Sequence, residues 1–223
     1  MKICFVAWSD FGIGGVPKVL TCLMDALSRN HDVSLYSLKN LPQSGIHGIN
    51  REQIHIYCKE MNLYEKVRRS AADFLVTKTP LFSSALGCRL YAAARYTSGF
   101  KKALTNHLNK HQYDVVIFGS GFEDSLLLAL TKKKLLPSMR IMTWSHASYD
   151  NYFTNMGAFF SRYMKEAIKA YYHRFDEVIV LSDGDEKEFK EKHHLPARRI
   201  YNPNTMKPVS YTHLRAHETP EHL

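Results

Sequence analysis

Residues 2–38 read KICFVAWSDFGIGGVPKVLTCLMDALSRNHDVSLYSL, and this stretch decides the fold. The segment Lys2–Trp8 is short, apolar and rich in β-forming residues, which predicts a buried parallel strand. A glycine-rich turn follows, and apolar residues then recur at helical spacing from Val16 to Ser28, with Pro17 in the first turn where its missing N–H costs nothing. Asp32–Leu38 predicts a second strand. The stretch is therefore a βαβ unit, whose crossover we expect to be right-handed.

The remainder of the chain continues the same alternation of strands and helices. Four more apolar segments predict strands, namely Gln53–Cys58, Tyr113–Gly119, Arg140–Ser145 and a final one at Glu177–Ser182. Helical patterns cover Tyr64–Lys110 (broken near Pro80), Glu123–Leu136, Ala158–Phe175 and Asp183–His193. This order predicts an α/β fold with a doubly wound, Rossmann-like parallel sheet. Ligands of such sheets bind outside the carboxyl ends of the strands, so the residues just after each strand are the first candidates for a site.

The glycine-rich turn Gly12-x-Gly14-Gly15 differs from a dinucleotide-binding fingerprint. Pro17 stands where the third glycine is needed, and Tyr36–Leu38 offers no acid for the ribose hydroxyls. A G-x-x-x-x-G-K-[ST] phosphate loop is absent from the sequence as well. Two interpretations stay open: the backbone N–H groups at this helix start receive an anion or a closely approaching substrate, or the glycines only form a turn.

Composition limits the class of protein. The 223 residues are 45% hydrophobic, enough for one domain with a substantial core. An apolar run of about 18 residues is missing, so we expect no transmembrane helix, and the N-terminus lacks the features of a signal peptide. We therefore expect a cytoplasmic protein. Its cysteines form no C-x-x-C pair and are predicted to be small core residues rather than metal ligands: Cys4, Cys22, Cys58 and Cys88.

The net charge of +9 is concentrated in the helical segment. Between Lys59 and Lys110, ten Lys or Arg stand against three acids, interleaved with aromatic residues. This segment (64–110) has two main interpretations: contact with an anionic membrane surface, which would place the protein peripherally at the inner membrane face, or a solvated basic face over an apolar one. We expect no nucleic-acid partner, because no recognition motif accompanies the charge.

Residues 209–219 read VSYTHLRAHET and have no apolar periodicity. The string resembles one reading frame of a common sequencing-library adapter. We therefore expect residues 209–223 to be a disordered, non-native tail, and the native protein to continue past Pro208. His213, His217 and Glu218 are accordingly not interpreted as a metal site.

Several motifs in order resemble the retaining glycosyltransferases of family 4, which have the GT-B fold. The segment FGIGGVPKVL after the first strand resembles the family's G-G-A-E-R-V opening, although Val16-Pro17-Lys18 replaces A-E-R. The segment YDVVIF at 113–118 resembles the strand before the central crevice, and WSH at 144–146 resembles the strand that ends in a site histidine. The segments FDEVIVLSD at 175–183 and IYNPN at 200–204 resemble the end of the family's first domain. The likeness covers about residues 1–206.

The resemblance implies a fold, a reaction and site residues. Residues 1–208 would be the N-terminal, acceptor-side domain of a GT-B enzyme, and a missing C-terminal domain would bind the donor and supply an E-x₇-E pair. The donor would be a nucleotide sugar such as a UDP- or GDP-hexose, with no further cofactor and no metal, and the acceptor a sugar, cell-envelope polysaccharide or lipid-linked molecule. His146 is the candidate catalytic residue. The candidate phosphate- or acceptor-binding residues are Gly14, Gly15, Lys18, Ser120 and Ser145.

Two alternatives to a glycosyltransferase stay open from the residues. One is a non-catalytic Rossmann module that binds a nucleotide or another anion, and the other is an NAD- or SAM-dependent enzyme. In the glycosyltransferase interpretation this chain alone is expected to be inactive, because the donor contacts would lie in the second domain. A lone solvated lysine is also a reasonable interpretation of Lys18.

Overall fold

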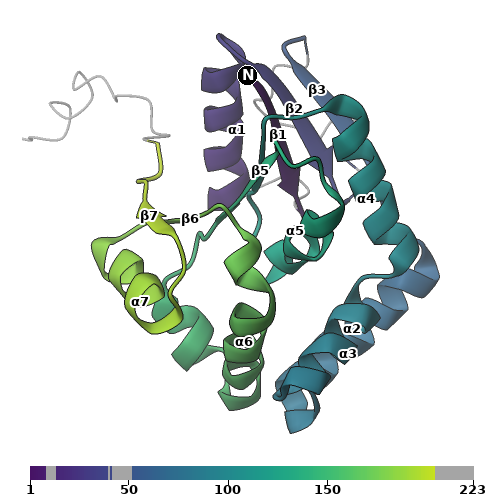
Figure 1. Cartoon of the computed structure of the whole chain (residues 1–223), viewed down its shortest axis with the longest axis vertical. Helices are drawn as coiled ribbons and strands as arrows, with labels where there is room; N and C mark the ends of the chain where they lie inside the picture. The colour runs from purple at the N-terminus through teal and green to yellow at the C-terminus, as the bar shows by residue number, and fades with distance from the viewer. Residues whose placement is uncertain (9–13, 40, 42–51, 204–223) are drawn as a thin grey trace, which may run out of the picture.

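The computed structural model describes residues 1–8, 14–39, 41 and 52–203. Gly12 of the glycine-rich turn and the tail at 209–223 lie outside this part of the chain. The described residues form one sheet of parallel strands in the order β3-β2-β1-β4-β5-β6-β7 (Figure 1). The strands are β1 (Lys2–Ala7), β2 (Asp32–Ser37), β3 (Ile54–Cys58), β4 (Val115–Phe118), β5 (Arg140–Trp144), β6 (Glu177–Val180) and β7 (Ala197–Arg199).

Helices cover both faces of the sheet, as predicted for a doubly wound fold. They are α1 (Gly15–Ser28), α2 (Leu63–Lys78), α3 (Ala85–Arg95), α4 (Ser98–His111), α5 (Leu126–Thr131), α6 (Ala158–Tyr171) and α7 (Asp183–His193). Short turns of 3-10 or π-helix lie at η1 (Pro80–Phe82), η2 (Glu123–Ser125), η3 (Lys132–Lys134), η4 (Asn151–Asn155) and η5 (Tyr172–Arg174). The fold class predicted from the sequence is confirmed.

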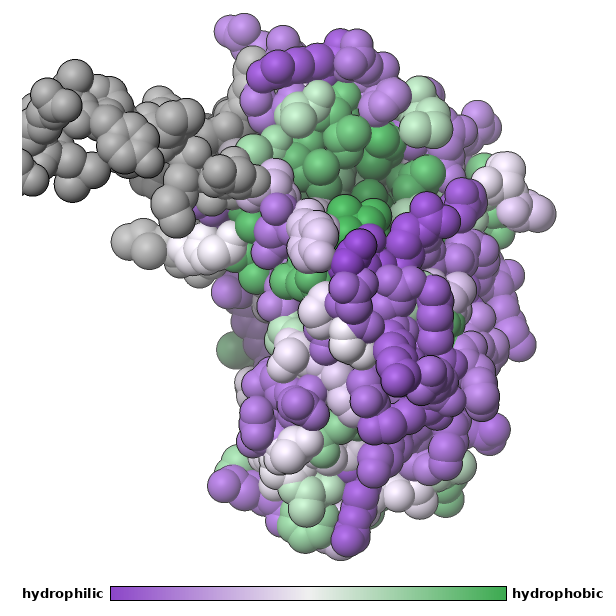
Figure 2. Space-filling model, turned by 90° about the vertical axis from the view of Figure 1, so that its left-hand side faces the viewer, coloured by the Kyte–Doolittle hydropathy of each residue, from purple (hydrophilic) through white to green (hydrophobic). Residues whose placement is uncertain are grey.

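Side chains of β1 alternate between two separate cores. Ile3, Phe5 and Ala7 pack with the apolar face of α1, whereas Cys4 and Val6 face a larger core formed with the other helices. On the α1 side, Ile117, Trp144 and Ile179 of the later strands are buried, whereas Val115 and Met142 remain only partly buried. Figure 2 looks at the side of the molecule where α1 lies and shows hydrophobic residues gathered in its upper part. The α1 side is therefore covered less completely than the opposite side.

Capping residues divide the basic segment 64–110 into three helices. Asn62 begins α2 with a capping box, in which its side chain accepts a hydrogen bond from the Glu65 N–H (2.9 Å). Ser84 caps α3 and Thr97 caps α4 through equivalent bonds of 3.1 Å. The sequence predicted the break near Pro80 but not the second one, at Thr97. Figure 1 shows α2 and α3 side by side at the lower right, where they project from the sheet.

One strand was missed. The sequence indicated that Glu177–Ser182 is the final strand, but Ala197–Arg199 adds β7 to the edge of the sheet, in register with Val178–Val180. Its three residues contain two arginines, so they lack the apolar pattern of a buried strand. Short, charged strands are typical of sheet edges, where they discourage pairing with another chain.

Candidate functional site

The candidate site lies where the strand order reverses. Strand β1 pairs with β2 on one side and with β4 on the other, and their carboxyl ends lie at the same edge of the sheet. In doubly wound folds this switch point is the usual ligand crevice. Two hydrogen bonds hold the strand ends together: the Trp8 N–H donates to the Ser120 hydroxyl, and the Gly119 N–H donates to the Val6 carbonyl at 3.0 Å.

The start of α1 presents open backbone at this edge. Gly14 is the N-cap residue and has no side chain that could accept a hydrogen bond from the first turn, which also contains no acid. Gly15 is exposed, and among the described residues no heavy atom outside its chain neighbours and its own helix lies within 4 Å of the position that its Cβ would occupy. Lys18 is exposed one turn further along. Unsatisfied N–H groups and the helix dipole make such a start favourable for an anion.

His146 follows β5 and lies beside Gly119 at the same edge. Its ring stacks on the Trp144 indole, with 5.0 Å between the centroids. Both ring nitrogens are shielded from solvent and lack a hydrogen-bond partner of normal geometry within the described residues. Burial lowers the pKa of His146 to about 4, against a smaller opposing effect of the Gly119 backbone. The imidazole is therefore neutral near pH 7 and suited to hydrogen bonding with a hydroxyl.

The hydroxyls of the two candidate serines are hydrogen-bonded to backbone groups. Ser145 is almost fully buried, and its hydroxyl donates to the Ala147 carbonyl at 2.8 Å. Ser120 is half-buried and accepts the Trp8 hydrogen bond described above. The structure thus brings Ser120 and His146 to the switch point but turns the Ser145 hydroxyl to the backbone. A binding role for any of these residues stays a prediction.

Sequence reasoning missed a cavity on the other side of β1. This cavity, which we call the β1–β3 pocket, has a volume of about 400 Å³ and lies at the carboxyl ends of β1, β2 and β3 against α2. Trp8 and Arg69 form one wall, with the guanidinium carbon 3.8 Å from the indole centroid. Trp8 was predicted as the last residue of the first strand, whereas β1 ends at Ala7 and leaves Trp8 at the strand end. Arg69 had no signal in the sequence, because its position depends on how α2 docks.

Glu123 is a second residue that the sequence did not indicate. It lies in η2, just after β4, and one of its carboxylate oxygens is buried without a partner among the described residues. Burial, and then the nearby Asp124, raise the pKa of Glu123 above its ordinary value. The carboxyl lies close to Gly121, where a Cβ would be 3.3 Å from a Glu123 oxygen.

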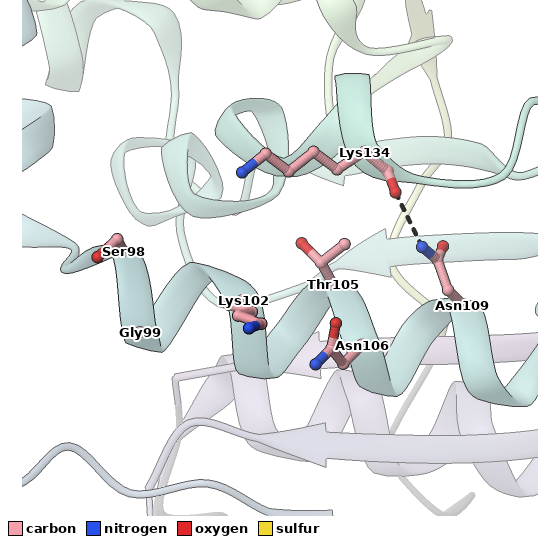
Figure 3. A pocket seen from close by; sticks show the side chains of 7 residues that line it. All are labelled: Ser98, Gly99, Lys102, Thr105, Asn106, Asn109 and Lys134. Atoms are coloured by element: carbon pink, nitrogen blue, oxygen red, sulfur yellow. Dashed lines mark hydrogen bonds between the residues drawn. The ribbon is translucent and has the colours of Figure 1, made fainter.

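A larger pocket, of about 590 Å³, lies away from the strand ends. Figure 3 shows that α4 and the η3 residue Lys134 form it, with Ser98, Lys102, Thr105 and Asn106 along the helix. The Asn109 side chain bridges the two elements by donating to the Lys134 carbonyl at 2.8 Å. We call this the α4 pocket. It shares no residue with the switch point.

In the described part of the chain, no group of three His, Cys, Asp or Glu side chains is arranged to hold a metal ion. The four cysteines are free thiols: Cys4 and Cys88 are core residues as predicted, but Cys22 is only partly buried and Cys58 is exposed, so the prediction was wrong for Cys58. Burial raises the pKa of the Cys88 thiol to about 12, as expected for an unreactive core residue.

Comparison with known proteins now decides the family. The family model described as Glycosyltransferase Family 4 matches residues 13–203, most of the chain. The chain belongs to glycosyltransferase family 4. The fold agrees with this assignment: the structure titled "lipopolysaccharide outer core galactosyltransferase WaaB apo form" matches with a TM-score of 0.53 and 16% identity. The match covers 94% of this chain and 48% of that one.

A second solved structure is titled "alpha-glucosyltransferase in complex with UDP and a 13-mer DNA containing a central A:G mismatch". It matches with a TM-score of 0.42 and 14% identity, over 91% of this chain and 40% of that one. The chain thus spans about half the length of these solved structures or less. A search of the curated proteins gave no match.

Proposed function

We propose that this family 4 chain is the N-terminal, acceptor-side part of a nucleotide-sugar-dependent glycosyltransferase. The proposed reaction transfers a hexosyl unit to a cell-envelope polysaccharide, lipid-linked or similar acceptor. One observation supports the proposal: the glycine start of α1 and a neutral histidine lie at the same carboxyl edge of the sheet, in a fold that matches 48% of a galactosyltransferase chain. The galactosyltransferase identity belongs to that neighbour and supports only the reaction class here.

The chemistry of the edge fits this reaction. Sugar transfer expels a nucleoside diphosphate, and negative charge builds on the departing phosphate. The backbone N–H groups at the start of α1, at Gly14, Gly15 and Val16, would stabilise that charge, and the Lys18 side chain would add a positive one. His146 would hold a sugar hydroxyl as a neutral hydrogen-bonding partner. The donor would be a UDP- or GDP-hexose, and no further cofactor or metal is proposed.

The test is to re-amplify and sequence the locus through the codons after Pro208. Under the proposal the reading frame continues for roughly another 150–200 residues, about one domain, and encodes an E-x₇-E pair. The protein expressed from the complete reading frame should transfer sugar, whereas the 223-residue chain alone should not. A genuine stop codon near residue 208 would contradict the catalytic proposal and favour a non-catalytic nucleotide- or anion-binding module.

Membrane association is the second part of the proposal. Within the described residues, no helix is long and apolar enough to cross a bilayer. Large hydrophobic side chains that are more than half exposed nevertheless concentrate on α2, η1 and α3, namely Leu63, Tyr64, Val67, Phe74, Leu81, Leu86 and Leu90. The same region carries cations, at Arg68 and Lys78 on α2 and at Arg89 on α3. Exposed apolar side chains combined with cations favour an anionic bilayer surface.

Vesicle binding tests this second part. Phe74→Ser combined with Leu90→Ser should weaken co-sedimentation with vesicles of phosphatidylethanolamine and phosphatidylglycerol, because apolar area is lost from the projecting helices. Tyr201→Ser is the matched control, since Tyr201 is comparably exposed but lies after β7. Equal binding to neutral phosphatidylcholine vesicles would contradict a preference for an anionic surface. Equal loss in the control, or no binding at all, would leave the solvated-face interpretation. Under this proposal the protein is cytoplasmic and lies peripherally at the inner membrane face.

A further inference from the structure

The β1–β3 pocket has a cationic lining at the substrate edge of the sheet. Its lining includes Trp8, Lys39, Glu60, Lys66, Arg69 and Ser70. Three of these side chains are cations and one is an acid. Because Asp73 and Asp124 offset the charge of Arg69, the positive charge that attracts a ligand comes from the two lysines. A cavity lined in this way favours a negatively charged ligand, and its low-dielectric walls strengthen the attraction.

Lys66 and Glu60 form an accessible ion pair within this lining. The Lys66 ammonium lies 2.5 Å from a Glu60 carboxylate oxygen, and both side chains are about half exposed. Ion pairs this exposed contribute little stability, because water solvates both charges. An anionic ligand can therefore compete with Glu60 for Lys66 at small cost.

Arg69, by contrast, is rigidly held. Its side chain is only 14% exposed, Nη2 donates to Asp124 at 2.7 Å, and Nε donates to Asp73 at 3.3 Å. Its remaining amino group, Nη1, is buried and has no hydrogen-bond partner among the described residues. The flat guanidinium lies against the Trp8 indole. Arg69 and Trp8 thus make a preformed wall, which reduces the entropy that a ligand loses on binding.

The pocket and the start of α1 lie on different sides of β1. Helix α2 packs in the core formed by Cys4 and Val6, whereas α1 packs against Ile3 and Phe5. The edge therefore has two positions that favour an anion, reached from opposite faces of the sheet. A diphosphate bound at the start of α1 would account for the first position but not for the cations that line the β1–β3 pocket.

We propose that the β1–β3 pocket binds an anionic group, a phosphate or a carboxylate, carried by the sugar acceptor. This rests on the proposed glycosyltransferase function and gives its acceptor a chemical class. Lys66 contacts the anion after leaving Glu60, the Arg69–Trp8 wall fixes its position, and Glu60 repels it. Glu60 and Lys66 would then act in opposite directions on affinity.

The experiment uses the 223-residue chain without a sugar donor. Glucose 6-phosphate and glucuronate are the anionic probes, with glucose and inorganic phosphate as references, and binding is measured by calorimetry. Trp8 is a reporter in the pocket wall, so binding should also change tryptophan fluorescence. Trp8→Phe should abolish the fluorescence change but not the calorimetric signal. If glucose 6-phosphate binds more tightly than glucuronate, the pocket prefers a phosphate, and the reverse order indicates a carboxylate.

Variants of opposite sign make the test selective. Lys66→Gln should weaken glucose 6-phosphate binding about three- to ten-fold, and Glu60→Gln should strengthen it by a similar factor. Lys102→Gln, in the α4 pocket, removes an equal charge elsewhere and should change nothing. A merely structural Lys66–Glu60 pair would not produce opposite effects.

Three results would overturn the proposal. Glucose could bind as tightly as glucose 6-phosphate, inorganic phosphate could bind as tightly as the sugar phosphate, or Lys102→Gln could weaken binding as much as Lys66→Gln. Each result would leave the glycosyltransferase proposal standing without an acceptor anion in this pocket, because sequencing past Pro208 tests that proposal independently. A stop codon there, together with the expected variant pattern, would instead assign the pocket to a non-catalytic binding protein.

Discussion

Replacing Asp124 by Asn tests how the projecting helices are fixed to the sheet. Asp124 lies in η2, just after β4, and its side chain is 15% exposed. One carboxylate oxygen accepts from Arg69 of α2 at 2.7 Å and also from Arg95 of α3. Arg95 is 5% exposed, so its charge is almost fully removed from water. A single carboxylate therefore joins two helices to the strand end.

The expected cost follows from what Asn leaves behind. It preserves the shape of the side chain but removes the charge, so among the described residues Arg69 and Arg95 retain Asp73, which is 37% exposed, as their carboxylate partner. Removing one partner from a buried ion pair costs about 3–5 kcal/mol, because the remaining charge stays desolvated. Asp73→Asn is the matched comparison. It should cost about 1–2 kcal/mol, because water reaches Asp73 and only its hydrogen bonds weaken.

Urea unfolding followed by far-ultraviolet circular dichroism measures both variants. With a slope of about 2–3 kcal/mol per molar urea, Asp124→Asn should lower the midpoint by more than about 1 M. In the Arg69→Gln background the cost of Asp124→Asn should be smaller, because one of the stranded charges is already gone. If Asp124→Asn cost no more than Asp73→Asn, burial of the pair would not determine its energy and the reasoning would be refuted.

Three further predictions concern stability. Gly87→Ala should destabilise the chain by about 1–3 kcal/mol in urea unfolding, because the added Cβ would lie 2.2 Å from the Leu81 carbonyl oxygen; an unchanged midpoint would contradict this close packing. Asn62→Ala should cost about 1 kcal/mol by the same assay through loss of the α2 capping box, and no change would mean that the cap adds nothing. His146 binds its proton only near pH 4 when folded but near pH 6.5 when unfolded, so its contribution is present above pH 6.5 and lost as pH falls toward 4. His146→Asn should therefore reduce the drop in urea midpoint between pH 7 and 4.5, and an equal drop in both proteins would count against a buried neutral ring.

The strands at the switch point were predictable from sequence because their burial is continuous. Strands β1 and β4 are almost entirely apolar and buried, and β2 and β5 are also buried along most of their length, although they contain polar residues such as Ser34 and Thr143. Strand β7 has no such buried stretch. Two arginines in three residues are compatible with an edge strand, but sequence alone cannot distinguish them from a loop. The difference comes from pairing with β6, a contact that depends on the fold of the whole edge.

Like the strands, the residues of the candidate site fall into those that the sequence identified and those that it did not. The open glycine turn and His146 follow predicted strands, so the rule that ligands bind at strand ends identifies them. Arg69 lies more than sixty residues from Trp8 in a helix whose charges all look alike in sequence. Its burial against Trp8 depends on the capping box that begins α2 and on the ion pair with Asp124. Docking of a helix is a tertiary property, so no local pattern could have selected Arg69 over Arg68.

The arrangement around β1 also bears on how the two substrates would meet. In the proposed reaction, the acceptor anion enters on the α2 side, and the donor phosphates approach the start of α1 on the other side. The hydrogen bond from the Trp8 N–H to the Ser120 hydroxyl joins the carboxyl ends of β1 and β4 at this edge of the sheet. Substrates held in this way approach each other over the strand ends with their charges kept apart, which limits electrostatic repulsion between two anions. His146 lies at the same edge, and because its imidazole is neutral near pH 7 it adds no charge to the acceptor or the donor position.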